Sequence, residues 1–105
     1  MSKPQAQAQD PVVIRVWKGQ PDDVFALFPT DPADNYGQYC TSYQHVGQHS
    51  SADYHHCIRQ SRPATKAEAR PLLTELRRIG YRPRVLKRAS PRHHDERLSA
   101  ARGVV

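Results

Sequence analysis

The sequence predicts an α+β domain, and three observations lead to this fold class. Four short segments rich in β-branched and aromatic residues come first, and turn-forming residues separate them. A single amphipathic helical pattern follows over residues 65–79. One more extended segment, residues 81–88, comes after the helix. The element order β-β-β-β-α-β therefore predicts a small, mostly antiparallel sheet with one helix packed on one face.

The first two predicted strands, residues 12–18 and 23–28, form a hairpin around the turn sequence Gly-Gln-Pro-Asp. Both segments are dominated by Val, Ile, Phe and Trp, which favour strands. Side chains alternate along a strand, so we expect Val12, Ile14 and Val16 on one face. That face is the candidate core surface of the hairpin.

The third and fourth predicted strands cover residues 38–46 and 53–60. A turn-rich loop, residues 29–37, precedes the third strand, and a small polar loop, residues 47–52, precedes the fourth. The last strand, residues 81–88, contains Arg-Pro. Proline cannot donate to a strand ladder, so this segment is expected at an edge of the sheet.

The predicted helix has a start signal, an apolar stripe and a stop signal. Thr65 and Glu68 form a T-x-x-E capping box with Thr65 as the N-cap. Gly80 stands where a glycine commonly follows a helix end. Pro71 falls at the sixth helical position, where it removes one hydrogen bond and is expected to kink the helix. The stripe consists of four residues at helical spacing, Leu72, Leu73, Leu76 and Ile79.

The predicted domain is shorter than the chain, whose hydrophobic fraction of 37% is low for a globular domain. Residues 1–11 are polar and low in complexity, which predicts a disordered tail. Residues 12–88 form the single domain, and residues 89–105 are expected to be a basic, largely mobile tail. Apolar runs are too short for a membrane span and no export signal is visible. We therefore expect a cytoplasmic protein with Cys40 and Cys57 as free thiols.

Positive charge is concentrated in the C-terminal part of the chain. Residues 1–62 carry five basic and six acidic residues, whereas residues 63–105 carry eleven basic and four acidic ones. Seven basic residues lie between Glu75 and Asp95 with no acidic residue among them: Arg77, Arg78, Arg82, Arg84, Lys87, Arg88 and Arg92. Such a block suits an anionic partner, either nucleic acid or an acidic protein surface. The alternative is a hydrated basic face that keeps a small domain in solution.

A row of aromatic residues is a second candidate binding surface. Tyr39, Thr41, Tyr43 and His45 are two residues apart, so they line one face of the third predicted strand. Beside the basic residues such a row can stack exposed bases, and His49 completes the candidate partner-binding set. The alternative is that this face packs beneath the helix, because Tyr is common on sheets for its shape alone.

Six His and Cys residues close together in the sequence are candidate metal ligands. They are Cys40, His45, His49, His55, His56 and Cys57. Zinc takes four such ligands, but no close Cys pair is present. Cys40 and His45 have an odd separation and so face opposite sides of a strand. We therefore expect core and sheet-surface residues here, without a metal or another cofactor, and keep metal binding as the alternative.

The same residues include the types needed for cysteine-based catalysis. Cys40 or Cys57 would be the nucleophile, with His45 or His49 as base and Asp53 as the orienting carboxylate. No catalytic signature surrounds either Cys, so the sequence favours a non-enzymatic protein.

Several short stretches carry a resemblance to other proteins. They are residues 26–29 (ALFP), 42–49 (SYQHVGQH), 52–54 (ADY), 64–65 (AT), 80–81 (GY) and 84–88 (RVLKR). These stretches resemble a group of short bacterial proteins that are usually labelled hypothetical and are often carried on plasmids or integrated mobile elements. The match runs from about residue 12 to residue 88, and S-Y-x-H-x-G-Q-H is its most specific part. The resemblance implies a small cytoplasmic accessory protein and brings no activity with it.

The residues favour a small interaction protein that binds nucleic acid through its basic C-terminal segment. The first alternative is a protein-binding regulator or inhibitor, whose basic segment meets an acidic protein surface. The second alternative is a small metal-binding or metal-dependent protein that uses the His/Cys cluster. No membrane partner is expected.

Overall fold

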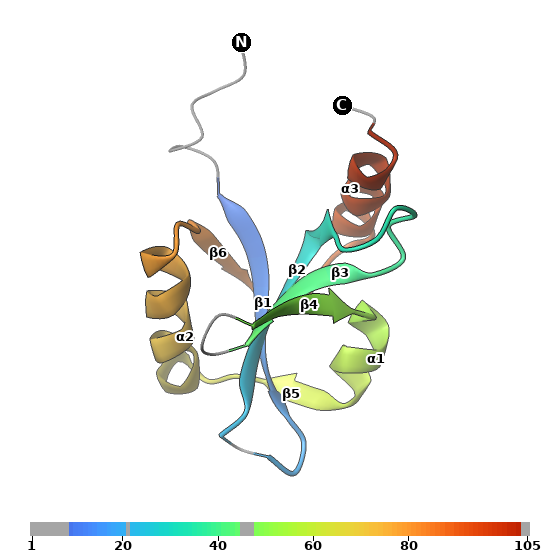
Figure 1. Cartoon of the computed structure of the whole chain (residues 1–105). Coiled ribbons are helices and arrows are strands. Elements are labelled where there is room, and N and C mark those ends of the chain that lie inside the picture. Colours follow the sequence, from blue (N-terminus) through green and yellow to red (C-terminus); the bar gives the residue numbers. More distant parts are fainter. Residues whose placement is uncertain (1–8, 21, 45–47, 104–105) are drawn as a thin grey trace.

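A central sheet with helices on both faces forms the framework of the protein (Figure 1). The computed structural model describes residues 9–20, 22–44 and 48–103. Within these ranges the strands are β1 (Asp10–Trp17), β2 (Val24–Pro32), β3 (Cys40–Gln44), β4 (Gln48–Ala52), β5 (Ser61–Pro63) and β6 (Pro83–Leu86). The helices are α1 (Tyr54–Arg59), α2 (Lys66–Arg78) and α3 (Pro91–Ala101). The predicted α+β class is therefore confirmed.

The sheet order is β4-β3-β2-β1, with antiparallel pairing throughout this part. The other edge of β1 is shared by two short strands. β5 pairs antiparallel with residues 15–17, and β6 pairs parallel with residues 10–13. The chain leaves β5, forms α2 across one face and returns to the same edge as β6 (Figure 1). This double use of one edge brings β6 and α2 side by side.

One face of the sheet packs against α2. Five sheet residues at alternating positions of β1, β2 and β3 contribute to this core: Val12, Ile14, Ala26, Phe28 and Tyr43. Ala69, Leu72 and Leu76 of α2 complete it. The predicted hairpin and the predicted apolar stripe of the helix thus meet, as expected from their periodicities.

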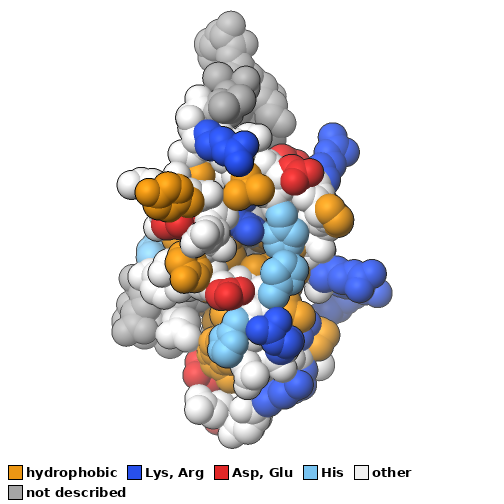
Figure 2. All heavy atoms as spheres, turned by 90° about the vertical axis from the view of Figure 1, so that its right-hand side faces the viewer, with side chains coloured by type: hydrophobic (Ala, Val, Ile, Leu, Met, Phe, Trp, Pro, Cys, Tyr) orange, Lys and Arg blue, Asp and Glu red, His pale blue; other side chains and the backbone are white. Residues whose placement is uncertain are grey.

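The opposite face is also buried, because α1 and α3 cover it. Val13, Phe25, Leu27 and Cys40 of the sheet form this second core with three residues of the β4–α1 region, Ala52, Tyr54 and Cys57. In β1 every residue from Val12 to Val16 is consequently buried. The prediction of one helix on one face is corrected to helices on both faces. Figure 2 views the side that carries α1 and α3, where histidine side chains gather.

The predicted fourth strand, residues 53–60, is wrong. This segment is the short helix α1, and the strand lies before it, over residues 48–52 that were predicted as a loop. Asp53 begins the helix, since its side chain accepts a hydrogen bond from the His56 backbone N–H at 3.2 Å. Tyr54 and Cys57 are three residues apart and both buried, which is helical rather than strand spacing.

The predicted mobile tail over residues 89–105 is corrected for the part that forms α3, which packs against β2. Arg97 of α3 is buried and donates to the backbone carbonyls of Gly37 (2.9 Å) and Pro29 (2.8 Å). Gly37 has a φ of +75°, and a Cβ there would lie 3.1 Å from the backbone of Leu98. Polar anchoring of this kind leaves no apolar pattern in the sequence, and this is why the sequence predicts a largely mobile segment here.

The predicted N-terminal tail, residues 1–11, falls partly outside the described residues, which begin at residue 9. Asp10 and Pro11 belong to β1, so the sheet starts earlier than predicted. At the helix, Thr65 and Glu68 form the predicted capping box. Pro71 lies inside α2 and is exposed, so water can reach the carbonyl left without a helical partner. Within the described part of the chain, no helix has both the length and the apolar character to cross a membrane.

Leu76→Ala is expected to lower the free energy of unfolding by about 2–5 kcal/mol, because the side chain is fully buried between α2 and the sheet. Chemical denaturation of the purified protein measures this loss. Ile79→Ala is the matched control: Ile79 ends the same stripe but is 48% exposed, so its loss should stay within about 0.5 kcal/mol. A loss below about 1 kcal/mol for Leu76→Ala would contradict the packing of α2 described here.

Candidate functional site

The main candidate site is a groove between α2 and β6 with a volume of about 490 Å³. Its apolar lining includes Ile14 at the base, Leu73 from α2 and Val85 from β6. Four basic side chains also line it: Lys66, Arg70, Arg77 and Lys87. Among the described residues, no Asp or Glu contributes to the lining. We call this feature the α2–β6 groove.

The basic residues of the groove come largely from one stripe of α2. Lys66, Arg70, Leu73 and Arg77 are spaced by four, three and four residues, which places them on one side of a helix. The buried stripe of Ala69, Leu72 and Leu76 lies beside it. The helix therefore presents an apolar stripe to the sheet and a mainly basic stripe to the groove. Lys66 and Arg70 were absent from the sequence-based candidates, although their spacing with Arg77 was a usable signal.

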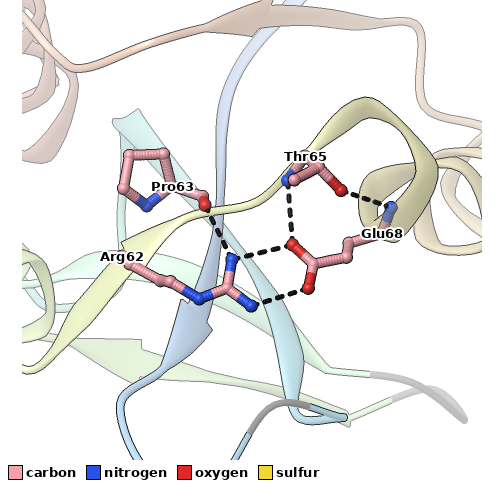
Figure 3. A network of polar contacts seen from close by, with 4 residues as sticks. All are labelled: Arg62, Pro63, Thr65 and Glu68. Atoms are coloured by element: carbon pink, nitrogen blue, oxygen red, sulfur yellow. Dashed lines mark hydrogen bonds and ion pairs between the residues drawn. The ribbon is translucent and has the colours of Figure 1, made fainter.

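The start of α2 is held by a network of polar contacts around Glu68 (Figure 3), and Glu68 is not part of the groove lining. Arg62 donates to both oxygens of Glu68, at 2.8 and 2.6 Å. The Thr65 backbone N–H donates to Glu68 at 2.9 Å, and the Thr65 hydroxyl accepts from the Glu68 N–H at 3.1 Å. The Arg62 guanidinium and then the Thr65 N–H lower the pKa of Glu68 to about 2. Glu68 is thus ionised at neutral pH and accepts hydrogen bonds from Arg62 and Thr65.

All seven basic residues predicted as a binding segment are exposed. The structure brings Arg77 and Lys87 together at the α2–β6 groove, and it places Arg84 on the other side of β6 from Val85. Arg78, Arg88 and Arg92 lie outside the groove lining. Within the described ranges, the one ion pair recorded for the seven is the contact of Arg92 with Glu96 at 4.0 Å, and both side chains are largely exposed. An exposed pair of this kind contributes little.

A second hollow of about 580 Å³ lies at the C-terminal end of α2. Arg77, Tyr81 and Arg82 line it, so Arg77 belongs to both the groove and this hollow. The ring of Tyr81 stacks on Phe28 with centroids 4.8 Å apart. His49 Nε2 and the Tyr81 hydroxyl form a 2.9 Å hydrogen bond. We call this feature the Tyr81 hollow. The contacts with Phe28 and His49 hold the Tyr81 ring in place.

The described members of the predicted row Tyr39, Thr41, Tyr43 and His45 do not form a continuous surface on which bases could stack. Tyr43 is buried beneath α2 and its hydroxyl donates to the Glu75 carboxylate, as the packing alternative proposed. Tyr39 lies before β3 and is exposed, with its backbone N–H bonded to Asp34 Oδ1 at 3.0 Å. His45 lies outside the described residues. His49 pairs across the sheet with Tyr43 and forms a hydrogen bond with the Tyr81 hydroxyl.

The described His and Cys residues of the predicted metal cluster do not form a set of metal ligands. Cys40 is buried in β3 and Cys57 is buried in α1, while His55 and His56 are exposed on α1. In the described part of the chain, no three His, Cys, Asp or Glu side chains come close enough to hold a metal ion. Burial raises the pKa of Cys40 to about 12, and burial also raises the pKa of Cys57. Both groups are therefore thiols at neutral pH, which weakens them as nucleophiles.

A different group of histidines meets where α1 contacts α3. The ring of His94 lies 5.1 Å from that of His55 and 4.9 Å from that of Tyr54. Arg97 Nη1 donates to His94 Nδ1 at 2.8 Å, so this nitrogen must be unprotonated. Burial, followed by the charge of Arg97, lowers the pKa of His94. Sequence analysis did not find this group because His94 lies in the segment predicted to be mobile.

Comparisons of this chain with protein-family models, curated proteins and solved structures returned no match. The resemblance to short bacterial proteins therefore stays a prediction. The function is inferred below from the residues of this chain alone.

Treatment of the purified protein with a strong chelator is expected to leave its circular dichroism and melting temperature unchanged. The reason is that the described candidate ligands are divided between buried positions, in β3 and α1, and exposed positions on α1 and β4. Elemental analysis of the untreated protein is the companion measurement. Stoichiometric zinc together with unfolding on chelation would contradict this expectation and make the His/Cys cluster the main site.

The free energy of unfolding is expected to fall as the pH drops below about 6.5. Unfolded His94 takes up a proton at its ordinary pKa, whereas folded His94 stays neutral to lower pH, so acid favours the unfolded chain. The free energy of unfolding stops falling on this account once the pH is below the pKa of His94 in the folded protein. Denaturation of wild type and His94→Gln between about pH 7.5 and 5 measures the difference in slope. His56→Gln removes an exposed histidine and is the control; equal slopes for wild type and His94→Gln would refute this role.

Proposed function

We propose that this chain is a non-enzymatic protein that binds nucleic acid through the α2–β6 groove and the basic residues around it. The observation that carries the proposal is the lining of the groove, which has four basic side chains and no acidic one among the described residues. A surface of this kind attracts the phosphate backbone, because Lys and Arg release condensed counterions when they neutralise phosphates. Exposed Arg78 and Arg82 add positive charge near the C-terminal end of α2, beyond the groove.

The state of the neighbouring carboxylates supports the same function. Glu68 and Glu75 are the acidic residues of α2, and each is engaged on another side of the helix, with Arg62 and Tyr43 respectively. Among the described residues, no acidic side chain therefore lies beside the basic ones in the groove lining. An anion that binds there does not compete with an ion pair of this part of the chain, which favours binding of a phosphate group.

An acidic protein surface is the second candidate partner, and the apolar part of the groove favours it. Val85 is 53% exposed, and an apolar side chain of a partner could cover it. The edge of β6 argues against strand addition, however. This strand has four residues, begins with Pro83 and carries Arg84, features that protect an edge from pairing with another chain. A protein partner would have to dock through side chains, and nucleic acid remains the first proposal.

The joint substitution of Arg77, Arg78, Lys87, Arg88 and Arg92 by Gln is expected to abolish retention on heparin and binding to DNA or RNA. All five side chains are exposed, so circular dichroism and melting temperature should remain those of the wild type. For the wild type, log K against log salt should have a slope of about −2 to −4, as two to four neutralised phosphates require.

The control replaces exposed basic residues far from this segment in sequence, Lys18 and Arg59, together with Arg102. This triple variant lowers the net charge but should keep most of the affinity and the salt slope. If the wild-type protein fails to bind nucleic acid at low salt, the proposal is wrong, and the acidic protein partner takes its place.

A further inference from the structure

We infer that the nucleic acid bound at the α2–β6 groove is single-stranded, with one base on the apolar lining of the groove and a neighbouring base on Tyr81. This inference rests on the proposed function and specifies its ligand. It combines three features: an apolar lining inside a basic rim, a straight row of cations, and an aromatic ring at the end of that row.

The apolar lining of the groove favours binding of a single strand over binding of a duplex. Leu73 of α2, Val85 of β6 and Ile14 of β1 line the groove, and Val85 is 53% exposed. A duplex presents phosphates and sugars outward and keeps its bases stacked inside, so it would leave these side chains uncovered. An unpaired base can be inserted between them. The groove volume of about 490 Å³ lies within the range of sites that enclose small molecules, so a base with its sugar fits.

The cations of the rim are arranged in a line. Lys66, Arg70 and Arg77 follow one another along α2, and with 1.5 Å of rise per residue the row is about 16 Å long. Lys87 stands on the β6 side. Such a row can bind successive phosphates of one strand that follows the helix, while the bases turn toward the groove.

The row ends at an aromatic ring. Arg77 lines both the groove and the Tyr81 hollow, and Arg82 stands on the other side of Tyr81 in the sequence. Phe28 stacks on the ring and His49 holds its hydroxyl, so the ring is fixed before a ligand arrives. A fixed aromatic ring between two arginines can stack a base without reading its identity. The strand therefore passes from the groove to the hollow past Arg77.

The test measures fluorescence anisotropy of a labelled single strand of about 12 nucleotides and of the matching duplex, with the full chain at fixed salt. The single strand is expected to bind at least about 10-fold more tightly. Val85→Ser should weaken single-strand binding by at least about 5-fold and leave duplex binding and the salt slope unchanged. Ile79→Ser is the matched control, since Ile79 is also half-exposed but lies outside the groove lining, and should have no effect.

Tyr81→Ala should weaken single-strand binding by about 5- to 150-fold, whereas Tyr81→Phe, which keeps the ring, should bind like the wild type. If Tyr81→Ala loses its fold, Val85→Ser still decides the question, because Val85 is not part of either core. Arg77→Gln should instead reduce the salt slope by about one.

Each outcome has a distinct meaning. Equal affinity for both ligands, with Val85→Ser silent, overturns the inference and leaves the proposed function standing. Binding of neither nucleic acid overturns both. Tighter binding of polyglutamate than of the single strand, at equal charge and salt, also overturns both and indicates an acidic protein partner.

Discussion

The architecture depends on one buried cation in the middle of β1. Arg15 lies on the sheet face that α1 covers, where it donates to the Ser61 hydroxyl at 2.9 Å and to the backbone carbonyls of Ser61 (2.7 Å) and Ile58 (3.0 Å). Burial lowers the pKa of Arg15, and a guanidinium removed from water requires such acceptors. These hydrogen bonds join the end of α1 and the first residue of β5 to β1. The starting point of α2, and with it one wall of the groove, follows from that junction.

A second buried arginine, Arg97, attaches the C-terminal helix α3 to the rest of the fold in a similar way. Arg97 binds the carbonyls of Gly37 and Pro29, and its remaining contact is with His94. Both arginines use backbone carbonyls rather than carboxylates, so neither forms a buried ion pair. Directed hydrogen bonds of this kind let a chain that is only 37% hydrophobic cover two faces of a sheet. They also make α3 sensitive to the protonation of His94, because the same guanidinium donates to its ring.

The candidate function follows from how α2 divides its surface. One stripe of the helix supplies core residues, and the next supplies cations to the groove. Glu68 belongs to the network with Arg62, and Glu75 accepts from Tyr43, so the carboxylates of the helix are directed away from the cations. The apolar lining at Val85 and the ring of Tyr81 then add contacts that bases can use and phosphates cannot. Charge supplies attraction here, and these apolar and aromatic surfaces supply the preference for a single strand.

The sequence by itself determined the α+β class, the β1–β2 hairpin, the capping box at Thr65 and the concentration of positive charge in the C-terminal part of the chain. Each is encoded within a few neighbouring residues, by alternation, by cap spacing or by charges that water stabilises. Tertiary structure decided the rest. The segment 53–60 is too short for its hydrophobic period to distinguish a helix from a strand. It is a helix in the structure, where this conformation buries both Tyr54 and Cys57. Likewise α3 docks through Arg97 and Gly37, which are sixty residues apart, and the groove joins Lys66 to Lys87 only because two strands share one edge of β1.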